Sequence, residues 1–247
     1  MDISQFLDST YLKTPEQAGL SDAENLKLVR NTISESIEYK FKLVMIRPDM
    51  VSIARQMITE AHSKVLVGTV IDFPNGNGSI EAKLAEAQQA IDNGADDLDF
   101  VVNFEAFKAG DTAVVKQQVE QCSRLGLEAG KTVKWIIEIA ALNDHQIVQL
   151  TALIKNIILS HFEESDYSSV YVKSSTGFYR TEDGVSNGAT IPAIKLMLEN
   201  SFPLPVKAAG GVRNFEEVVQ MIELGVKRIG TSAAKAIVSG QIASGSY

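Results

Sequence analysis

The chain has 247 residues, of which 45% are hydrophobic and 22% charged, and its formal net charge at pH 7 is −8. This composition is typical of a globular protein with a large core and excludes a disordered or fibrous chain. The negative balance opposes binding to nucleic-acid backbones or anionic membranes, so we expect neither partner.

The cysteine count and the first residues bear on location. Cys122 is the one cysteine, which excludes an intramolecular disulfide and fits a reducing compartment. The chain starts with an acid at its second position, and no stretch approaches the roughly 18 uninterrupted apolar residues of a membrane span. We expect a cytoplasmic protein.

Short apolar runs recur along the chain, and segments with helical spacing lie between them. In chain order the runs cover residues 6–12, 42–47, 65–71, 98–104, 133–140, 170–174, 204–209 and 228–232. Between the third and fourth runs, for example, Leu84, Ala87 and Ile91 share one helix face. Strands that alternate with helices indicate a parallel sheet.

Seven of these runs indicate strands, and the segment 6–12 would supply a short eighth; together they predict one α/β domain, a single TIM (β/α)8 barrel over residues 1–247 with a short C-terminal tail near 240–247. No Pro/Ser-rich linker, solenoid-length repeat or shift in composition divides the chain. An open doubly wound sheet is the alternative.

Strand side chains alternate between two faces, so the parity of the apolar residues shows which residues point inward. In the run 170–174 the valines share one parity and Lys173 takes the other. The same reasoning turns Lys207, Asp99 and Glu138 toward the inside of the barrel, on three further strands. We expect these four side chains to converge.

Two lysines and two carboxylates inside a barrel need a reason, because unpaired buried charge is costly. A structural ion-pair network, or lysines that reach the barrel rim, would be one reason. Chemistry is the other, because a partly desolvated lysine near a second cation has a lowered pKa and keeps some neutral amine near pH 7. Such an amine is a Schiff-base nucleophile.

Two glycine-bearing turns are predicted after the last two strands. Gly210 and Gly211 follow the seventh strand, and Gly230 with Ser232 leads into a helix expected near Ala233. Glycines let backbone N–H groups approach an anion, and the loops after strands seven and eight of a barrel are the usual phosphate site. We expect a phosphate site here, with plain turns as the alternative.

The histidines do not suggest a metal site. His62, His145 and His161 fall in helical or loop segments rather than at strand ends, and neither Asp72 nor the pair 96–97 forms a recognisable hard-cation loop. We expect metal-free chemistry.

Three motifs in combination resemble those of the deoxyribose-phosphate aldolases, a family of class I aldolases. They are GADDLDFVV at 94–102, VKSSTGF at 172–178 and VKAAGGVR at 206–213. The similarity also takes in the segments 73–83, 136–138 and 228–232, so it spans essentially the whole chain.

This resemblance implies an enzyme that reversibly cleaves 2-deoxy-D-ribose 5-phosphate to acetaldehyde and D-glyceraldehyde 3-phosphate on a TIM barrel, without metal or organic cofactor. It makes Lys173 the Schiff-base lysine, Lys207 the second lysine that tunes it, and Asp99 the acidic member of a proton relay. Family members are commonly dimers or tetramers, so a homo-oligomer is also implied. The residues that fall on phosphate-binding segments are Gly177, Gly210, Gly211, Gly230 and Ser232.

The chain departs from the family pattern at Phe178, where some members carry a lysine that helps to hold the phosphate. We therefore expect backbone groups to carry most of the phosphate binding. Two other interpretations stay open: another Schiff-base sugar-phosphate aldolase or transaldolase-like barrel, and a non-catalytic sugar-phosphate-binding barrel. The second has no use for a pair of interior lysines.

The C-terminal segment 242–247 consists mostly of small residues and ends in Tyr247. Some family members end in a tyrosine that visits the active site, and Gly245 would let the tail fold back over the barrel mouth. There the phenol would exchange a proton at the carbon that becomes the enamine. A frayed terminus is the alternative.

Overall fold

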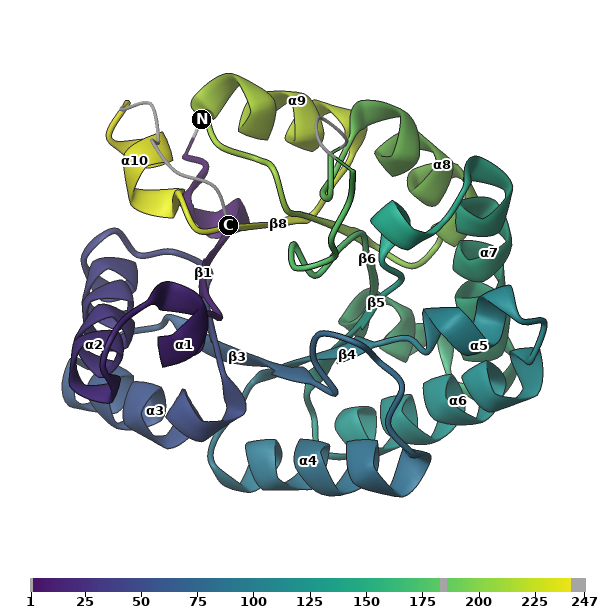
Figure 1. Ribbon diagram of the computed structural model, residues 1–247, viewed down its shortest axis with the longest axis horizontal. Coiled ribbons are helices and arrows are strands. Elements are labelled where there is room, and N and C mark those ends of the chain that lie inside the picture. Colours follow the sequence, from purple (N-terminus) through teal and green to yellow (C-terminus); the bar gives the residue numbers. More distant parts are fainter. Residues whose placement is uncertain (1, 183–185, 241–247) are drawn as a thin grey trace.

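Eight parallel strands form a closed barrel with the helices outside it (Figure 1). The computed structural model describes residues 2–182 and 186–240. Each strand pairs with the next along the chain, and β8 returns to β1, with Leu7 opposite Ile229 and Asp8 opposite Gly230. The strands are β1 (Leu7–Tyr11), β2 (Leu43–Ile46), β3 (Leu66–Ile71), β4 (Asp97–Val101), β5 (Thr132–Ile136), β6 (Val170–Lys173), β7 (Val206–Ala209) and β8 (Arg228–Thr231).

Helices connect the carboxyl end of each strand to the amino end of the next. They are α1 (Pro15–Ala18), α2 (Asp22–Glu38), α3 (Val51–Glu60), α4 (Ile80–Asp92), α5 (Phe104–Lys108), α6 (Thr112–Glu128), α7 (Asp144–His161), α8 (Ile191–Ser201), α9 (Phe215–Leu224) and α10 (Ala234–Val238). Short 3-10 turns cover Ser4–Phe6, Pro48–Met50, Ile139–Ala141 and Glu164–Ser169.

The closed barrel confirms the predicted fold, and the open doubly wound sheet is wrong. The fifth strand is shorter than predicted: it ends at Ile136, because Glu138 takes a left-handed backbone conformation (φ 56°) and a 3-10 turn follows. No helix within the described ranges is long and apolar enough to cross a membrane.

Side-chain caps fix where several helices begin and end. Ser21 and Glu24 form a capping box at the start of α2, and Asn143 and Gln146 form another at the start of α7. Gly225 ends α9 with φ 110°, a conformation that side chains with a Cβ rarely adopt. These caps determine where α2 and α7 begin and where α9 ends.

The main core lies between the barrel and its helices. Leu98, Phe100 and Trp135, which have the outward parity, are fully buried there. The rings of Phe100 and Trp135 stack with their centroids 5.0 Å apart. Cys122 on α6 belongs to the same core.

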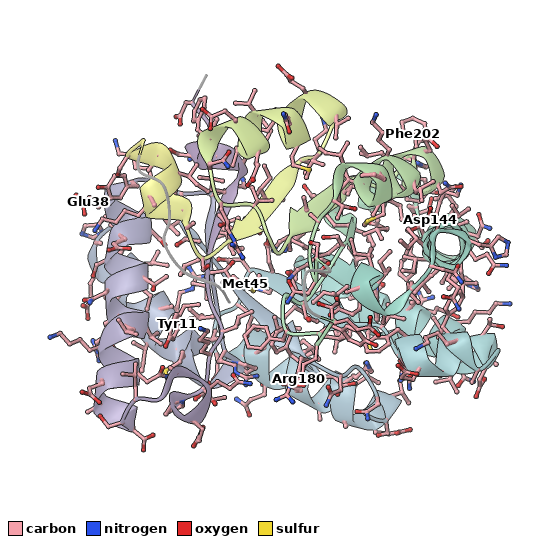
Figure 2. All side chains as sticks on the ribbon, turned by 45° about the horizontal axis from the view of Figure 1, so that its top comes forward. Tyr11, Glu38, Met45, Asp144, Arg180 and Phe202 are labelled. Atoms are coloured by element: carbon pink, nitrogen blue, oxygen red, sulfur yellow. The ribbon has the colours of Figure 1, made fainter. Side chains whose placement is uncertain are left out.

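The inside of the barrel is apolar on one side and charged on the other. Leu12, Leu43, Met45 and Val70 pack together on the side of β1 to β3, and Met45 is labelled near the middle of the barrel in Figure 2. Gly68 leaves room for this packing, because a Cβ there would lie 2.6 Å from Met45 Cε. The other side, formed mainly by β4 to β8, holds the buried charges.

Candidate active site

Asp99 on β4 brings the two predicted lysines together. Its Oδ2 accepts hydrogen bonds from Lys173 Nζ at 2.8 Å and from Lys207 Nζ at 2.9 Å. Lys173 is the last residue of β6, and its register partner on β7 is Lys207. All three residues are at most 3% exposed. Their predicted convergence inside the barrel is confirmed.

Four further charged side chains surround this trio, and we call Asp8, Asp97, Lys134 and Arg228 the supporting cluster. Lys134 Nζ bridges Asp97 Oδ2 at 2.7 Å and Asp99 Oδ1 at 2.8 Å. A guanidinium nitrogen of Arg228 lies 2.7 Å from Asp8 Oδ1 and 3.1 Å from Asp97 Oδ2. The supporting cluster therefore holds Asp99 by the oxygen that the two predicted lysines do not use.

The supporting cluster also reaches the second lysine directly. Asp8 Oδ2 lies 2.6 Å from Lys207 Nζ, an ion pair that lacks the alignment of a hydrogen bond. The residues of the supporting cluster were not predicted as site residues, although strand parity turns two of them toward the barrel interior. Asp97 has the parity of Asp99, and Lys134 has the parity expected for Glu138.

Neighbouring cations lower the pKa values of two buried carboxylates, Asp99 and Asp8. Burial alone would raise the pKa of Asp99, but the charges of Lys134, Lys173 and Lys207 hold it well below its usual value. Burial likewise opposes the charged form of Asp8, whose pKa is nevertheless lowered, first of all by Arg228. Asp8 and Asp99 are therefore ionised at neutral pH.

Lys173 behaves differently from the other cations. Burial lowers its pKa to about 8, the charge of Asp99 opposes this shift, and the charge of Lys207 adds to it. Roughly one tenth of Lys173 is therefore neutral amine at pH 7. The site thus contains a buried amine that is partly neutral near pH 7.

Glu138 lies beyond the end of β5, not within a strand as predicted. Its backbone is left-handed (φ 56°, ψ 69°) and its side chain is 1% exposed. Oε2 accepts hydrogen bonds from the backbone N (3.2 Å) and the hydroxyl of Thr176, in the loop after Lys173. Burial raises the pKa of Glu138 to about 7. Glu138 therefore bonds to the loop after Lys173, and the prediction that it joins Asp99 and the two lysines as an inward-facing strand residue is wrong.

Three glycines, Gly177, Gly188 and Gly210, lie close together in the loops that follow Lys173 and Lys207. Gly177 and Gly210 have φ of 81° and 82°, and a Cβ on Gly210 would lie 2.9 Å from Gly188 Cα and 3.7 Å from Gly177 Cα. Gly211, at φ 78°, follows directly. Side chains would separate these backbones, so glycine is required for their close approach. Gly188 was not predicted, and its contact with Gly210 depends on tertiary structure.

The second predicted glycine turn is different. Gly230 lies inside β8, where a Cβ would come 3.2 Å from Lys207 Cε, so its lack of a side chain leaves room for that lysine. Ser232 is exposed in the turn that follows β8. The next helix, α10, begins at Ala234 and has five residues. The prediction of a turn at Gly230 is wrong, because the strand continues to Thr231.

Phe178 lies on the apolar side of the barrel mouth. Its ring packs edge to face against Phe73, with centroids 5.0 Å apart, and the guanidinium of Arg47 lies 5.6 Å above the Phe73 ring. Position 178 thus contributes apolar contact where a cation stands in some members of the resembling family.

The carboxyl end of a parallel barrel is where such folds carry out catalysis, and here it holds a buried amine beside an ionised carboxylate. Within the described ranges, no three His, Cys, Asp or Glu side chains are grouped so that they could hold a metal ion. Fold and site together are those of a barrel enzyme with a buried lysine at the end where such folds place their catalytic residues.

The chain belongs to the DeoC/LacD family of aldolases, whose family model matches residues 14–242. It is therefore an aldolase, a carbon–carbon lyase, and the non-catalytic barrel is excluded.

Similar proteins match nearly the whole chain. The deoxyribose-phosphate aldolase of Thermococcus gammatolerans is 36% identical over 97% of this chain and 96% of its own length. That of Streptococcus pneumoniae serotype 19F is 36% identical over all of both chains. The tetrameric deoxyribose phosphate aldolase structure from Aeropyrum pernix superposes with a TM-score of 0.76 at 25% identity, over 96% of this chain and 89% of that one.

Proposed function

We propose that this aldolase reversibly cleaves 2-deoxy-D-ribose 5-phosphate to acetaldehyde and D-glyceraldehyde 3-phosphate through a Schiff base on Lys173. The observation that carries the proposal is the buried Lys173 amine, 2.8 Å from Asp99 Oδ2, with its pKa lowered to about 8. The names of the relatives support this choice of substrate.

Counting charges supports Lys173 as the nucleophile over its neighbours. Among the described residues, the network contains three carboxylates, Asp8, Asp97 and Asp99, and four cations. Lys134, Lys207 and Arg228 each contact two of the carboxylates, whereas Lys173 contacts one. Three cations balance three carboxylates, so the fourth cation loses its proton at the lowest cost.

The reaction follows from these positions. The neutral amine of Lys173 attacks the C1 carbonyl carbon of the open-chain sugar, and the resulting carbinolamine loses water to form an iminium. The bond between C2 and C3 then breaks, the C3 hydroxyl gives up its proton, and the electron pair moves toward the iminium nitrogen to leave an enamine. Protonation of the enamine carbon and hydrolysis release acetaldehyde and restore the amine.

Asp99 and Lys207 are suited to move the protons that these steps need. Both lie beside the Lys173 nitrogen, through the shared contact at Asp99 Oδ2. Asp99 is ionised and faces the Lys173 nitrogen; because its lowered pKa makes it a weak base, it passes a proton on through the relay rather than keeping it, and Lys207 is placed to donate one. A bound water between them and the substrate would complete the relay.

The phosphate group has a matching place at the glycines. Gly177, Gly210 and Gly211 combine left-handed backbones with the absence of side chains, so their N–H groups are open to an anion. Gly230 and Ser232 complete the phosphate site, with Ser232 as its exposed edge. Phe178 supplies no charge, so the phosphate is held mainly by backbone groups.

Tyr247 is proposed to exchange the proton at the enamine carbon. It belongs to the segment 241–247 and lies outside the described residues. Deleting Tyr247 should slow exchange of the acetaldehyde methyl protons with solvent more than it slows Schiff-base formation at Lys173. Equal slowing of both would return the tail to a frayed terminus.

Assembly and location are proposed on separate grounds. The Aeropyrum pernix relative is described as a tetramer, which supports a homo-oligomer, dimer or tetramer, for this chain. The single cysteine is buried and supports a reducing, cytoplasmic setting. Sedimentation velocity tests the first proposal, and fractionation of the source cells tests the second. The partners are the small phosphorylated sugar and aldehyde substrates.

Borohydride trapping tests the central proposal. Incubation with acetaldehyde and borohydride should add an ethyl group to Lys173, and peptide mass mapping would locate it. Lys173→Arg should abolish both the label and turnover, whereas Lys195→Arg, at an exposed position, should change neither. A label on Lys207 or Lys134, with Lys173→Arg still active, would overturn the assignment.

A further inference from the structure

Glu138 is a second carboxylate beside the Lys173 segment, and the proposed reaction does not use it. Its left-handed backbone, at φ 56°, is uncommon for a residue with a side chain. Such conformations persist where the surroundings hold them, and they concentrate at functional sites. The contacts of Glu138 therefore show what this conformation achieves.

Those contacts tie Glu138 to the loop that follows Lys173. The hydroxyl of Thr176 donates to Glu138 Oε2 and accepts from Phe178 N at 3.0 Å, while Thr176 N donates to the same Oε2 at 3.2 Å. On either side of Glu138, Ile137 N donates to Lys173 O at 3.0 Å and Ile139 N to Ser174 O at 2.9 Å. The segments 137–139 and 173–178 are thus joined at four points.

The second carboxylate oxygen of Glu138 differs from the first in its contacts. Oε1 of Glu138 is buried and has no hydrogen-bond partner among the described residues. Leaving a buried oxygen unsatisfied costs free energy, and in native proteins such groups call for an explanation. A side chain kept there under that cost, and bonded by its other oxygen to one loop, is more consistent with a role in the site than with packing.

We propose that the ionised Glu138 carboxylate is a positioning group that holds Thr176, and through it the loop after Lys173, in the conformation that receives the phosphorylated end of the substrate. This inference rests on the proposed function. Gly177 follows Thr176 directly and lies in the glycine group beside Gly210. A shift of Thr176 would therefore be transmitted to the proposed phosphate site.

The strength of this hold depends on pH. Burial raises the pKa of Glu138 to about 7, while the hydrogen bonds from Thr176 and the charge of Lys173 act in the opposite direction. Lys173, on β6, is the charged group among the described residues that acts on this carboxylate; Thr176, from the same segment, donates without a charge. Hydrogen bonds to an ionised carboxylate are roughly twice as strong as neutral ones. The loop should therefore be held more firmly as pH rises through 7.

Glu138→Gln tests the proposal, because glutamine keeps the shape and cannot ionise. At pH 8, kcat/KM for deoxyribose 5-phosphate should fall roughly tenfold or more, as expected when a site group is misplaced. At pH 6, where the wild-type carboxyl is itself protonated, the two enzymes should converge. Trapping of acetaldehyde on Lys173 needs no phosphate site and should stay within about twofold of wild type. Glu199→Gln, at an exposed position, is the matched control.

The outcomes separate this inference from the function on which it rests. If wild-type Lys173 is not labelled by acetaldehyde and borohydride, the proposed function fails. If Lys173 is labelled, but Glu138→Gln lowers kcat/KM by the same factor at pH 6 and pH 8, the positioning role of Glu138 alone is wrong. Equal losses of trapping and turnover in the variant would also refute it.

Thr176→Val approaches the same contact from the other side and serves if Glu138→Gln does not fold. The lost hydroxyl is one of the groups that lower the pKa of Glu138. Its removal should therefore move the ionisation near pH 7 in the kcat/KM profile to higher pH. A general structural defect would lower the profile without moving that ionisation, and an unmoved ionisation would contradict the proposal.

Discussion

The supporting cluster and the group around Lys173 are both buried and charged, yet they are built differently. In the supporting cluster each ion contacts at least two opposite charges, as Lys134 does with Asp97 and Asp99. Around Lys173 the pairing among the described residues is incomplete, because Lys173 contacts one carboxylate there and Glu138 Oε1 accepts no hydrogen bond. Complete pairing fixes charge states, whereas incomplete pairing brings pKa values close to neutrality.

The barrel interior thus contains ions of fixed charge beside groups whose protonation changes near neutral pH. The pKa values of Lys173 and Glu138 are about 8 and about 7, while that of Asp99, between the two groups, lies well below its usual value. Groups that exchange protons near neutral pH can thus stand beside groups that do not. Variants that change one charge in either group should show which residues have a fixed charge and which titrate near neutral pH.

The largest expected effect comes from breaking the supporting cluster. Lys134→Met would leave Asp97 and Asp99 without their shared cation, and removing one partner from a buried ion pair costs about 3–5 kcal/mol. Urea unfolding should show a loss of this size. Lys116→Met, at an exposed position, should lose less than about 0.5 kcal/mol. A loss in Lys134→Met as small as in this control would mean that the supporting cluster does not stabilise the fold.

The second effect concerns the contact between the two groups. Lys207→Leu removes a positive charge that lowers the pKa of Lys173, so that pKa should rise and the acidic limb of the pH–rate profile should move to higher pH. Loss of the proton donor should also lower kcat about a hundredfold. Lys207→Arg keeps the charge and should leave the limb in place. If the acidic limb does not move in Lys207→Leu, the charge of Lys207 does not lower the pKa of Lys173.

A third prediction uses the raised pKa of Glu138 as a statement about stability. The folded protein holds this proton up to about pH 7, whereas the unfolded chain releases it near 4.5, so ionising Glu138 lowers stability as pH rises between these values. Glu138→Gln should therefore match wild type at pH 4.5 and gain on the order of 1–3 kcal/mol at pH 8. Thermal unfolding at both pH values checks this, and a gain independent of pH would argue against it.

The smallest effect is expected at the mouth, at Phe178. Phe178→Lys adds a cation near the proposed phosphate site and should raise the preference for phosphorylated over free sugar by less than tenfold. The lost contact with Phe73 should cost about 1 kcal/mol. Phe178→Leu removes the ring without adding charge and separates the two effects. No gain in preference for Phe178→Lys would place the phosphate elsewhere.

The sequence carried the fold and the centre of the site because both follow from short-range patterns. Alternation along single strands placed Asp99, Lys173 and Lys207 on one face, and strand–helix alternation predicted the barrel. The same rule would have found Asp97 and Lys134 if it had been applied to every charged residue in a strand.

The remaining features arise where local patterns stop. Asp8 and Arg228 are 220 positions apart and meet only because β8 closes on β1. A left-handed backbone is usually marked by glycine or asparagine, but position 138 is a glutamate. The sequence therefore does not show that β5 ends before Glu138, and strand parity does not hold there. Gly188 meets Gly210 through the folding back of a loop, which a pattern of neighbouring residues cannot show.

The 2.8 Å contact between Lys173 Nζ and Asp99 Oδ2 has a consequence for the proposed intermediate. An iminium carries its positive charge on the same nitrogen that holds the charge in the protonated lysine. The carboxylate that faces the ammonium therefore already faces the iminium, and the other five ions need not move when the intermediate forms or decays. The reorganisation energy of each step is correspondingly small, because one charge appears and disappears at one atom within a fixed field.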